Sequence, residues 1–103
     1  MKRGEIRWYK FKPPDKKRPV LILTRASAIE YLGEVTVAPI TTTVRDIPSE
    51  VPLSREDGMP RECAVNLDHV QTLSKGKVGG LISQLSSEKI SELRAALSFA
   101  LAL

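Results

Sequence analysis

Short apolar runs rich in β-branched and aromatic residues alternate with polar segments over the first three quarters of the chain. Runs of this length and composition are typical of β-strands. The run at residues 19–24 consists almost wholly of Leu and β-branched residues, which indicates a buried strand. Six extended segments are predicted, at residues 5–11, 19–24, 35–42, 49–53, 63–67 and 69–73.

The segments between these strands carry their own local signals. Residues 13–15, Pro-Pro-Asp, predict a turn or loop, and residues 55–60 form a polar loop. Residues 27–32 predict a helical turn that stops at Gly33. Gly79 and Gly80 are interpreted as a tight turn.

The last part of the chain changes to a helical period. Ser86 or Ser87 is a suitable N-cap, and Glu88 adds a carboxylate to the first turn. Apolar residues then recur at helical spacing, at Ile90, Leu93, Leu97 and Leu101. Short strands followed by one helix predict a mainly β fold with a C-terminal helix, a small barrel or strongly bent sheet. We expect a single domain over residues 1–103.

Composition places this domain in an ordinary class. A hydrophobic fraction of 42% in 103 residues is typical of a soluble globular chain. The lone cysteine, Cys63, has no internal partner for a disulfide. The basic N-terminus lacks the apolar core of a signal peptide, and the apolar end at residues 97–103 is too short to span a bilayer. We therefore expect a cytoplasmic protein that does not enter a membrane.

Charge is distributed unevenly along the chain. The first 25 residues contain nine of the sixteen Lys and Arg residues and carry net +7, whereas the remainder carries net −3. Such a field attracts polyanions. Lys16, Lys17 and Arg18 run directly into the strand at residues 19–24, so Arg18 is expected at the mouth of a rigid element. A solvated loop is the common alternative for such a run.

Several catalytic chemistries do not fit the composition. A zinc centre needs more ligands than Cys63 and His69 provide, and the twelve carboxylates show no Asp-rich metal motif. No glycine-rich phosphate loop is present. A triad of Ser54, His69 and Asp68 has little support, because neighbouring side chains on a strand point to opposite faces. No metal or cofactor is expected.

Phosphoryl chemistry by arginine and hydroxyl groups fits the remaining residues. RNA can be cleaved without metal when its own 2′-hydroxyl attacks phosphorus, provided that a protein stabilises the developing charge and transfers two protons. Arginine binds two phosphate oxygens and stays charged. Thr41, Thr42 and Thr43 follow a predicted strand and offer hydroxyl donors. Each candidate also has a purely structural interpretation: threonines favour strands, Asp68 is a common turn residue, and His69 or Trp8 fits a strand or core.

Five short motifs follow one another along the chain: Lys2-Arg3-Gly4-Glu5-Ile6, Arg18-Pro19-Val20-Leu21-Ile22, Val37-Ala38-Pro39-Ile40-Thr41-Thr42, Ile47-Pro48-Ser49-Glu50-Val51 with Leu53, and Val65-Asn66-Leu67-Asp68-His69-Val70-Gln71-Thr72-Leu73. Their order resembles the MazF/PemK (Kid) toxins, and the resemblance covers nearly the whole chain, including the C-terminal helix. It implies an SH3-like small barrel of the CcdB/PemK type, a homodimer, and a metal-independent endoribonuclease that cuts single-stranded RNA at short sequences and is neutralised by a MazE-type antitoxin.

The resemblance also implies roles for individual residues. The catalytic arginine and threonine of MazF-like toxins fall on Arg18, as phosphate clamp and proton donor, and on Thr41, which steadies the scissile phosphate. The Kid branch uses an Arg and an Asp instead, with a His in the first loop. Asp68 matches that Asp and is a further catalytic candidate, whereas Asn66 stands at the Arg position and residues 12–17 contain no His. The residues expected to contact RNA are Lys16, Lys17, Thr42, Arg45, Ser49, Glu50 and His69.

Two other functions use the same kind of fold. One is a protein-binding poison resembling CcdB, which traps DNA gyrase through its last residues. The other is a barrel that binds RNA without cutting it. Arg18 and Thr41 together favour the nuclease, because a non-nuclease has no need for both.

Overall fold

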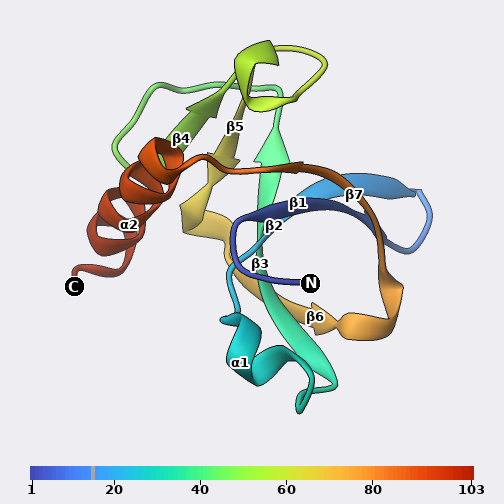
Figure 1. Ribbon diagram of the computed structural model, residues 1–103. Helices are drawn as coiled ribbons and strands as arrows, with labels where there is room; N and C mark the ends of the chain where they lie inside the picture. The colour runs from blue at the N-terminus through green and yellow to red at the C-terminus, as the bar shows by residue number, and fades with distance from the viewer. Residues whose placement is uncertain (15) are drawn as a thin grey trace.

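The computed structural model describes residues 1–14 and 16–103 (Figure 1). Asp15, the last residue of the predicted turn, lies outside the described residues. The prediction of a mainly β fold with a C-terminal helix is confirmed. The strands are β1 (Glu5–Lys10), β2 (Lys17–Ile22), β3 (Glu34–Thr41), β4 (Glu50–Leu53), β5 (Cys63–Asn66), β6 (Gln71–Ser74) and β7 (Val78–Gln84). The helices are α1 (Ala26–Ile29) and α2 (Ser87–Leu101), with the 3₁₀ turns η1 (Arg55–Asp57), η2 (Leu67–His69) and η3 (Lys75–Lys77).

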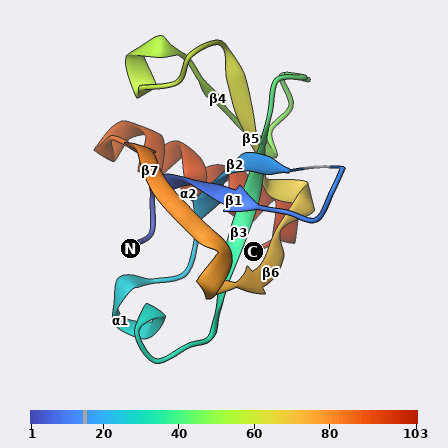
Figure 2. The ribbon, with the colours of Figure 1, turned by 90° about the vertical axis from the view of Figure 1, so that its right-hand side faces the viewer.

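The strands form one antiparallel sheet that bends around β3. The order is β4-β5-β3-β2-β1-β7, and β6 also pairs with β3. The beginning of β3 pairs with β6, and its end, at Ile40 and Thr41, pairs with β5. Strand β3 is shared by two parts of the sheet, β4 and β5 on one side of the bend and the remaining strands on the other. These two parts extend in different directions, as Figure 2 shows.

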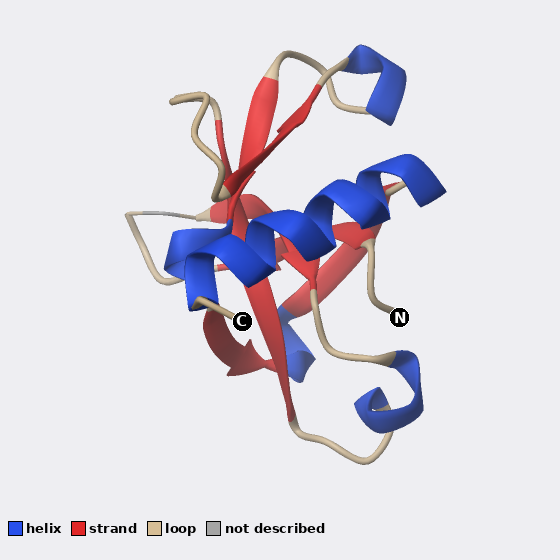
Figure 3. Ribbon diagram, turned by 90° about the vertical axis from the view of Figure 1, so that its left-hand side faces the viewer, coloured by secondary structure: helices blue, strands red, loops and turns tan. Residues whose placement is uncertain are grey.

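Two buried clusters lie on opposite faces of this sheet. Alternate residues of β2 enter different clusters: Leu21 belongs to the larger cluster, and Val20 and Ile22 belong to the smaller. Helix α2 covers the larger cluster with Leu93 and Ala96, and it lies across the sheet in Figure 3. In the described part of the chain, no helix is long and apolar enough to span a membrane.

The interpretation of Gly79 and Gly80 as a tight turn is wrong, because both lie within β7. This strand pairs with β1 through two irregularities in register. A Cβ atom at Gly79 would lie 3.4 Å from the carbonyl oxygen of Trp8, at the limit of ordinary van der Waals contact, so β7 packs directly against β1 here. Most of β7 is exposed or partly exposed, and therefore its sequence lacks the apolar alternation by which strands are found.

Candidate active site

A cavity of about 560 Å³ opens where β2 begins and β3 ends. Four residues predicted from sequence line it together: Arg18, Thr41, Thr42 and His69. The structure therefore brings the principal pair, Arg18 and Thr41, to one cavity and leaves neither in the hydrophobic interior. The other lining residues are Pro19, Pro39, Ile40, Thr43, Met59, Pro60, Arg61, Cys63 and Asn66.

The position of the cavity follows from how β3 exchanges partners. On one edge β3 pairs with β2, where Val20 lies opposite Pro39. Two residues further in the same antiparallel register, Arg18 corresponds to Thr41. On the other edge Thr41 pairs with Ala64 of β5. Thr41 thus lies between the strand that carries Arg18 and the strand that leads to η2.

The Thr41 hydroxyl is oriented by the backbone. The Thr43 N–H donates to Thr41 Oγ1 at 3.0 Å. Since a hydroxyl has one proton and two acceptor positions, this hydrogen bond occupies an acceptor position and leaves the O–H available as a donor. Thr41 is partly exposed in the cavity, so a ligand there can receive that proton in a hydrogen bond.

The lining of the cavity favours an anion. It contains the guanidinium groups of Arg18 and Arg61, and the described residues that line it include no Asp or Glu. Fixed positive charge attracts phosphate, and arginine binds phosphate through paired N–H donors. Burial raises the pKa of the Cys63 thiol, and the charge of Asp57 adds to this, so the thiol is protonated near neutral pH and is a poor nucleophile.

A smaller cavity of about 170 Å³ adjoins the first. Phe11 and Gln71 line it, together with four residues that also line the larger cavity. Arg18 is one of these shared residues, so its side chain lies at the junction of two adjoining spaces. The shared residues are Arg18, Pro19, Pro39 and Ile40.

Other residues predicted for the site lie outside the lining of the large cavity. Asp68 accepts a hydrogen bond from the Ser49 hydroxyl at 2.5 Å, and Ser49 is buried. Lys16 and Lys17 are exposed where the chain enters β2. Their roles in catalysis or RNA binding stay predictions.

Arg45 and Glu50 form an ion pair at the end of the β3–β4 loop. Glu50 accepts hydrogen bonds from the Arg45 backbone N–H at 2.9 Å and from Arg45 Nε at 2.8 Å. Burial alone would raise the pKa of Glu50, but the hydrogen bonds and charge of Arg45 outweigh it, so the pKa of Glu50 is lowered. The contacts show a loop anchor, and the predicted RNA contacts of both residues stay predictions.

Sequence reasoning missed two polar lining residues, Arg61 and Asn66. Arg61 follows a stretch that reads only as a polar loop, and no local pattern distinguishes its charge from that of Arg55. Asn66 stands in the right motif but at a position where the resemblance leads one to look for arginine. The one feature of the sequence that could have pointed to Asn66 is its short polar side chain, two residues before Asp68 in the same motif.

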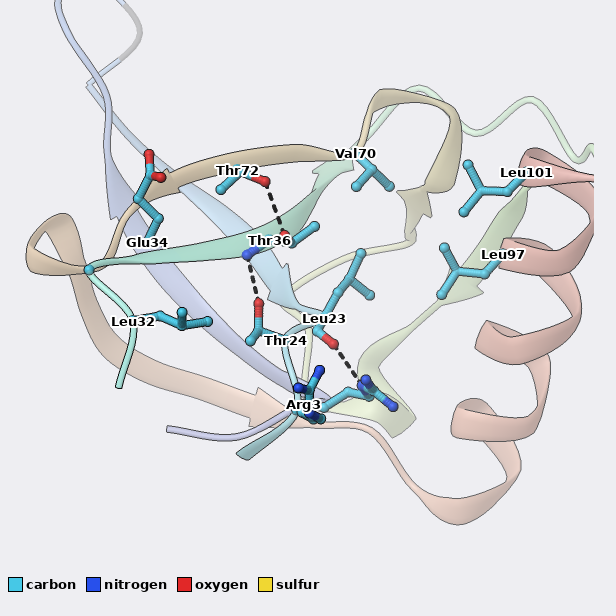
Figure 4. A pocket seen from close by; sticks show the side chains of 12 residues that line it. Arg3, Leu23, Thr24, Leu32, Glu34, Thr36, Val70, Thr72, Leu97 and Leu101 are labelled. Carbon is cyan, nitrogen blue, oxygen red and sulfur yellow. Dashed lines mark hydrogen bonds between the residues drawn. The ribbon is translucent and has the colours of Figure 1, made fainter. Parts of the chain in front are cut away.

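A second large cavity, of about 600 Å³, lies on another part of the surface between β3, β6 and the end of α2 (Figure 4). Leu97 and Leu101 approach it from the helix, and Val70 faces it from the segment before β6. Arg3 and Glu34 also line it. It contains none of the residues predicted for catalysis.

Comparison with known proteins places the chain in a family. Residues 2–101 match the model of the PemK-like, MazF-like toxins of type II toxin–antitoxin systems. This match extends over nearly the whole chain, and the chain therefore belongs to that family. The resemblance seen in the sequence motifs is confirmed.

Individual relatives agree with this assignment. Endoribonuclease MazF3 of Mycobacterium tuberculosis is 46% identical over 71 residues, 69% of each chain. Probable endoribonuclease MazF5 of the same species is 37% identical over 99 residues, which are 95% of this chain and 90% of the relative. These names favour the predicted enzyme class over the gyrase-poison and non-catalytic alternatives.

Solved structures confirm the fold. The Mycobacterium tuberculosis toxin MazF-mt6 superposes with a TM-score of 0.88 at 38% identity, covering 96% of this chain and 97% of the other. An endoribonuclease in complex with its cognate antitoxin, from a mycobacterial species, superposes with a TM-score of 0.87 at 25% identity, covering 100% and 96%. The predicted barrel of the PemK type with its C-terminal helix is thus confirmed.

Proposed function

We propose that this chain is an endoribonuclease toxin that cleaves single-stranded RNA at short sequences in the cavity between β2, β3 and η2, without a metal ion. The observation that carries the proposal is the convergence of Arg18 and Thr41 in one cavity. Relatives named endoribonucleases support the reaction class.

The proposed reaction uses the substrate's own nucleophile. The 2′-oxygen of ribose gives its proton to a water molecule and attacks the adjacent phosphorus, which closes a cyclic phosphate. The bond from phosphorus to the 5′-oxygen breaks, and that oxygen takes a proton from Arg18, which water then restores. Negative charge grows on the phosphoryl oxygens during this exchange, and the Arg18 guanidinium and the Thr41 hydroxyl stabilise it. Arg18 lies at the junction of two adjoining spaces, where it can hold a phosphate that links two nucleotides and protonate the leaving oxygen.

The basic segments around the cavity supply further affinity for RNA. Lys16 and Lys17 precede Arg18 at the start of β2, and Arg61 lines the cavity. Contacts from such side chains to backbone phosphates are independent of sequence and weaken with salt. Thr42 and His69 line the cavity and are placed to contact the bound strand. Arg45, Ser49 and Glu50 shape or border the loop beside it.

The proposal includes two protein partners. A solved relative is described in complex with its cognate antitoxin, which supports a MazE-type antitoxin for this chain. The second partner is another copy of the chain, seated on the cavity of Figure 4. That surface combines exposed Leu101 and Leu32 with both Arg3 and Glu34, so it can pair with itself about a two-fold axis. The expected place of action is the cytoplasm.

The test is cleavage of a long single-stranded RNA by the purified protein in EDTA. We expect discrete cuts that leave 5′-hydroxyl ends. Arg18→Ala and Thr41→Val are expected to lower the rate by about 10²–10³-fold, because each removes a donor to the charged transition state. Thr41→Ser is the matched control, since it retains the hydroxyl. RNA that stays intact over a wide range of protein concentrations contradicts the proposal.

A further inference from the structure

The large cavity has an opening and an interior of different chemistry. The residues at the opening are exposed and include both arginines, whereas the buried residues are mainly apolar. A phosphate fits the charged opening, and the flat faces of a nucleobase fit the apolar interior. The exposed lining residues are Arg18, Thr42, Thr43, Pro60, Arg61 and His69, and the buried ones are Met59, Cys63 and Asn66.

Asn66 is the polar member of this interior. It is 7% exposed, and its Oδ1 accepts the Asp68 backbone N–H at 3.0 Å. Only the oxygen of the amide can accept, so this contact fixes which way the group points. Within residues 1–14 and 16–103, this is the hydrogen bond that the Asn66 side chain makes, and it leaves the two N–H donors of Nδ2 for the cavity that Asn66 lines.

Among the described residues no buried side-chain polar atom lacks a hydrogen-bond partner, so Nδ2 is open to water in the cavity, and a ligand that displaces this water has to accept its hydrogen bonds. The ligand group must be an acceptor, because the amide oxygen is already bound. Uracil and guanine present an oxygen at pyrimidine C4 or purine C6, whereas cytosine and adenine present an amino group there. An amide that can only donate, and that faces this position of the base, therefore distinguishes these two classes of base.

We propose that Asn66 reads one nucleobase of the bound RNA by donating from Nδ2 to the exocyclic oxygen at pyrimidine C4 or purine C6. The subsite then favours uracil or guanine over cytosine or adenine. This inference rests on the proposed function, because it assigns a role within the same RNA-binding cavity. Asn66 acts here as a specificity residue and not as a group that touches the reacting phosphate.

Two variants separate base reading from the structural role of Asn66. Asn66→Ser keeps a short side-chain oxygen for the Asp68 N–H, but its side chain is shorter, so its one hydroxyl proton does not reach the position of Nδ2. Asn66→Asp keeps the shape and the same acceptor and replaces the donor by a second acceptor. Both retain the contact that begins η2, so a change of base preference reports on the missing donor.

The measurement is the cleavage of an RNA pool with a randomised segment, read by sequencing the 5′ ends of the products. For the wild type we expect one position near the cut at which uracil and guanine together exceed cytosine and adenine by roughly tenfold. Asn66→Ser is expected to reduce this ratio to about one, and Asn66→Asp is expected to reverse it with a lower overall rate.

Three results overturn the inference. An unchanged ratio in both variants means that Asn66 does not contact a base. A uniform loss of cleavage at all sequences, with the same ratio, assigns Asn66 to phosphate binding or to structure alone. If the wild type does not cleave the pool, the proposed function fails first and the inference with it, whereas the other two results leave the proposed function intact.

Discussion

Two side-chain oxygens in the large cavity, Thr41 Oγ1 and Asn66 Oδ1, each accept a nearby backbone N–H. The backbone therefore orients both groups before any ligand arrives, and both present protons toward the cavity. Donors held in place need no reorganisation when negative charge develops, which is the condition under which they contribute most to catalysis and recognition. In both cases the oxygen of a short polar side chain accepts a hydrogen bond from the backbone N–H two residues later in the chain.

Arg61 provides a prediction at this scale. Arg61→Ala is expected to raise KM for RNA about three- to tenfold with little change in kcat, because a phosphate contact contributes binding more than chemistry. The slope of log affinity against log salt concentration is expected to become less steep by about 0.7, the value for one phosphate of a single strand. Fluorescence anisotropy with a labelled RNA measures the slope.

Arg55→Ala is the matched control for Arg61→Ala. Arg55 is an exposed arginine of η1 on the same connection, and it does not line the cavity. It carries the same charge, so a general effect of net charge alters both variants equally. Equal salt slopes for the two variants would show that Arg61 has no direct contact with phosphate.

At the scale of elements, the sequence predicted those whose apolar pattern matches their burial. The strand at residues 19–24 was predicted from a continuous apolar run, and the observed β2, Lys17–Ile22, is buried on both faces. The helix with Leu93 was predicted because its apolar residues recur at helical spacing. Strand β7 was missed because Gly79 and Gly80 read as a turn, although both lie in a strand that pairs with β1. The pairing with β1 overrides the local preference of the glycines.

The sequence predicted those residues of the candidate site that stand in recognisable motifs at the ends of strands. Arg18 and Thr41 stand at strand ends in recognisable motifs, and the register of β2 and β3 brings those ends together. Arg61 was not predictable, because the path of its loop back to the cavity is set by packing and not by local sequence. Ser49 and Glu50 are polar residues whose burial and hydrogen bonds no local pattern reveals.

The β3–β4 loop gives a prediction at the scale of elements. Its end is held by the ion pair between Arg45 and buried Glu50, which lowers the pKa of Glu50 below 4.5. A group whose pKa is depressed by folding contributes stability above its unfolded value, and this contribution is lost as the pH falls through the folded value. Glu50→Gln is expected to lower the free energy of unfolding by about 2 kcal/mol at pH 7.

The difference between wild type and Glu50→Gln is expected to shrink as the pH falls below 4.5, because protonated Glu50 resembles the neutral amide. Urea unfolding at pH 7 and at several lower values measures it. The pKa of Glu5 is lowered as well, with burial opposing and Arg7 favouring the shift. Glu5 is unchanged in both proteins, so its acid sensitivity cancels in the difference. A difference that is independent of pH would show that the charge of Glu50 contributes no stability.

At the scale of the whole molecule, the two cavities share the basic residues of the first 25 positions and differ in their apolar lining. Nine basic residues lie in those positions; Arg18 lines the large cavity, whereas Arg3 and Arg25 line the cavity of Figure 4. The cavity of Figure 4 also gathers leucines from α2 and from the segment before β3. Arg18, with Lys16 and Lys17 before it, attracts a polyanion to the large cavity, and the leucines offer an apolar surface to a protein partner.

The proposed homodimer can be tested on that apolar surface. Leu101 is 55% exposed at the end of α2 and lines the cavity of Figure 4, so Leu101→Lys places a charge in the proposed contact without opening the core. We expect light scattering after gel filtration to give the mass of a dimer for the wild type and of a monomer for the variant. Leu81→Lys is the control, because Leu81 is 54% exposed on β7 and does not line the cavity of Figure 4. Dissociation by Leu81→Lys and not by Leu101→Lys would move the interface to the β7 edge, and a monomeric wild type would remove the dimer from the proposal.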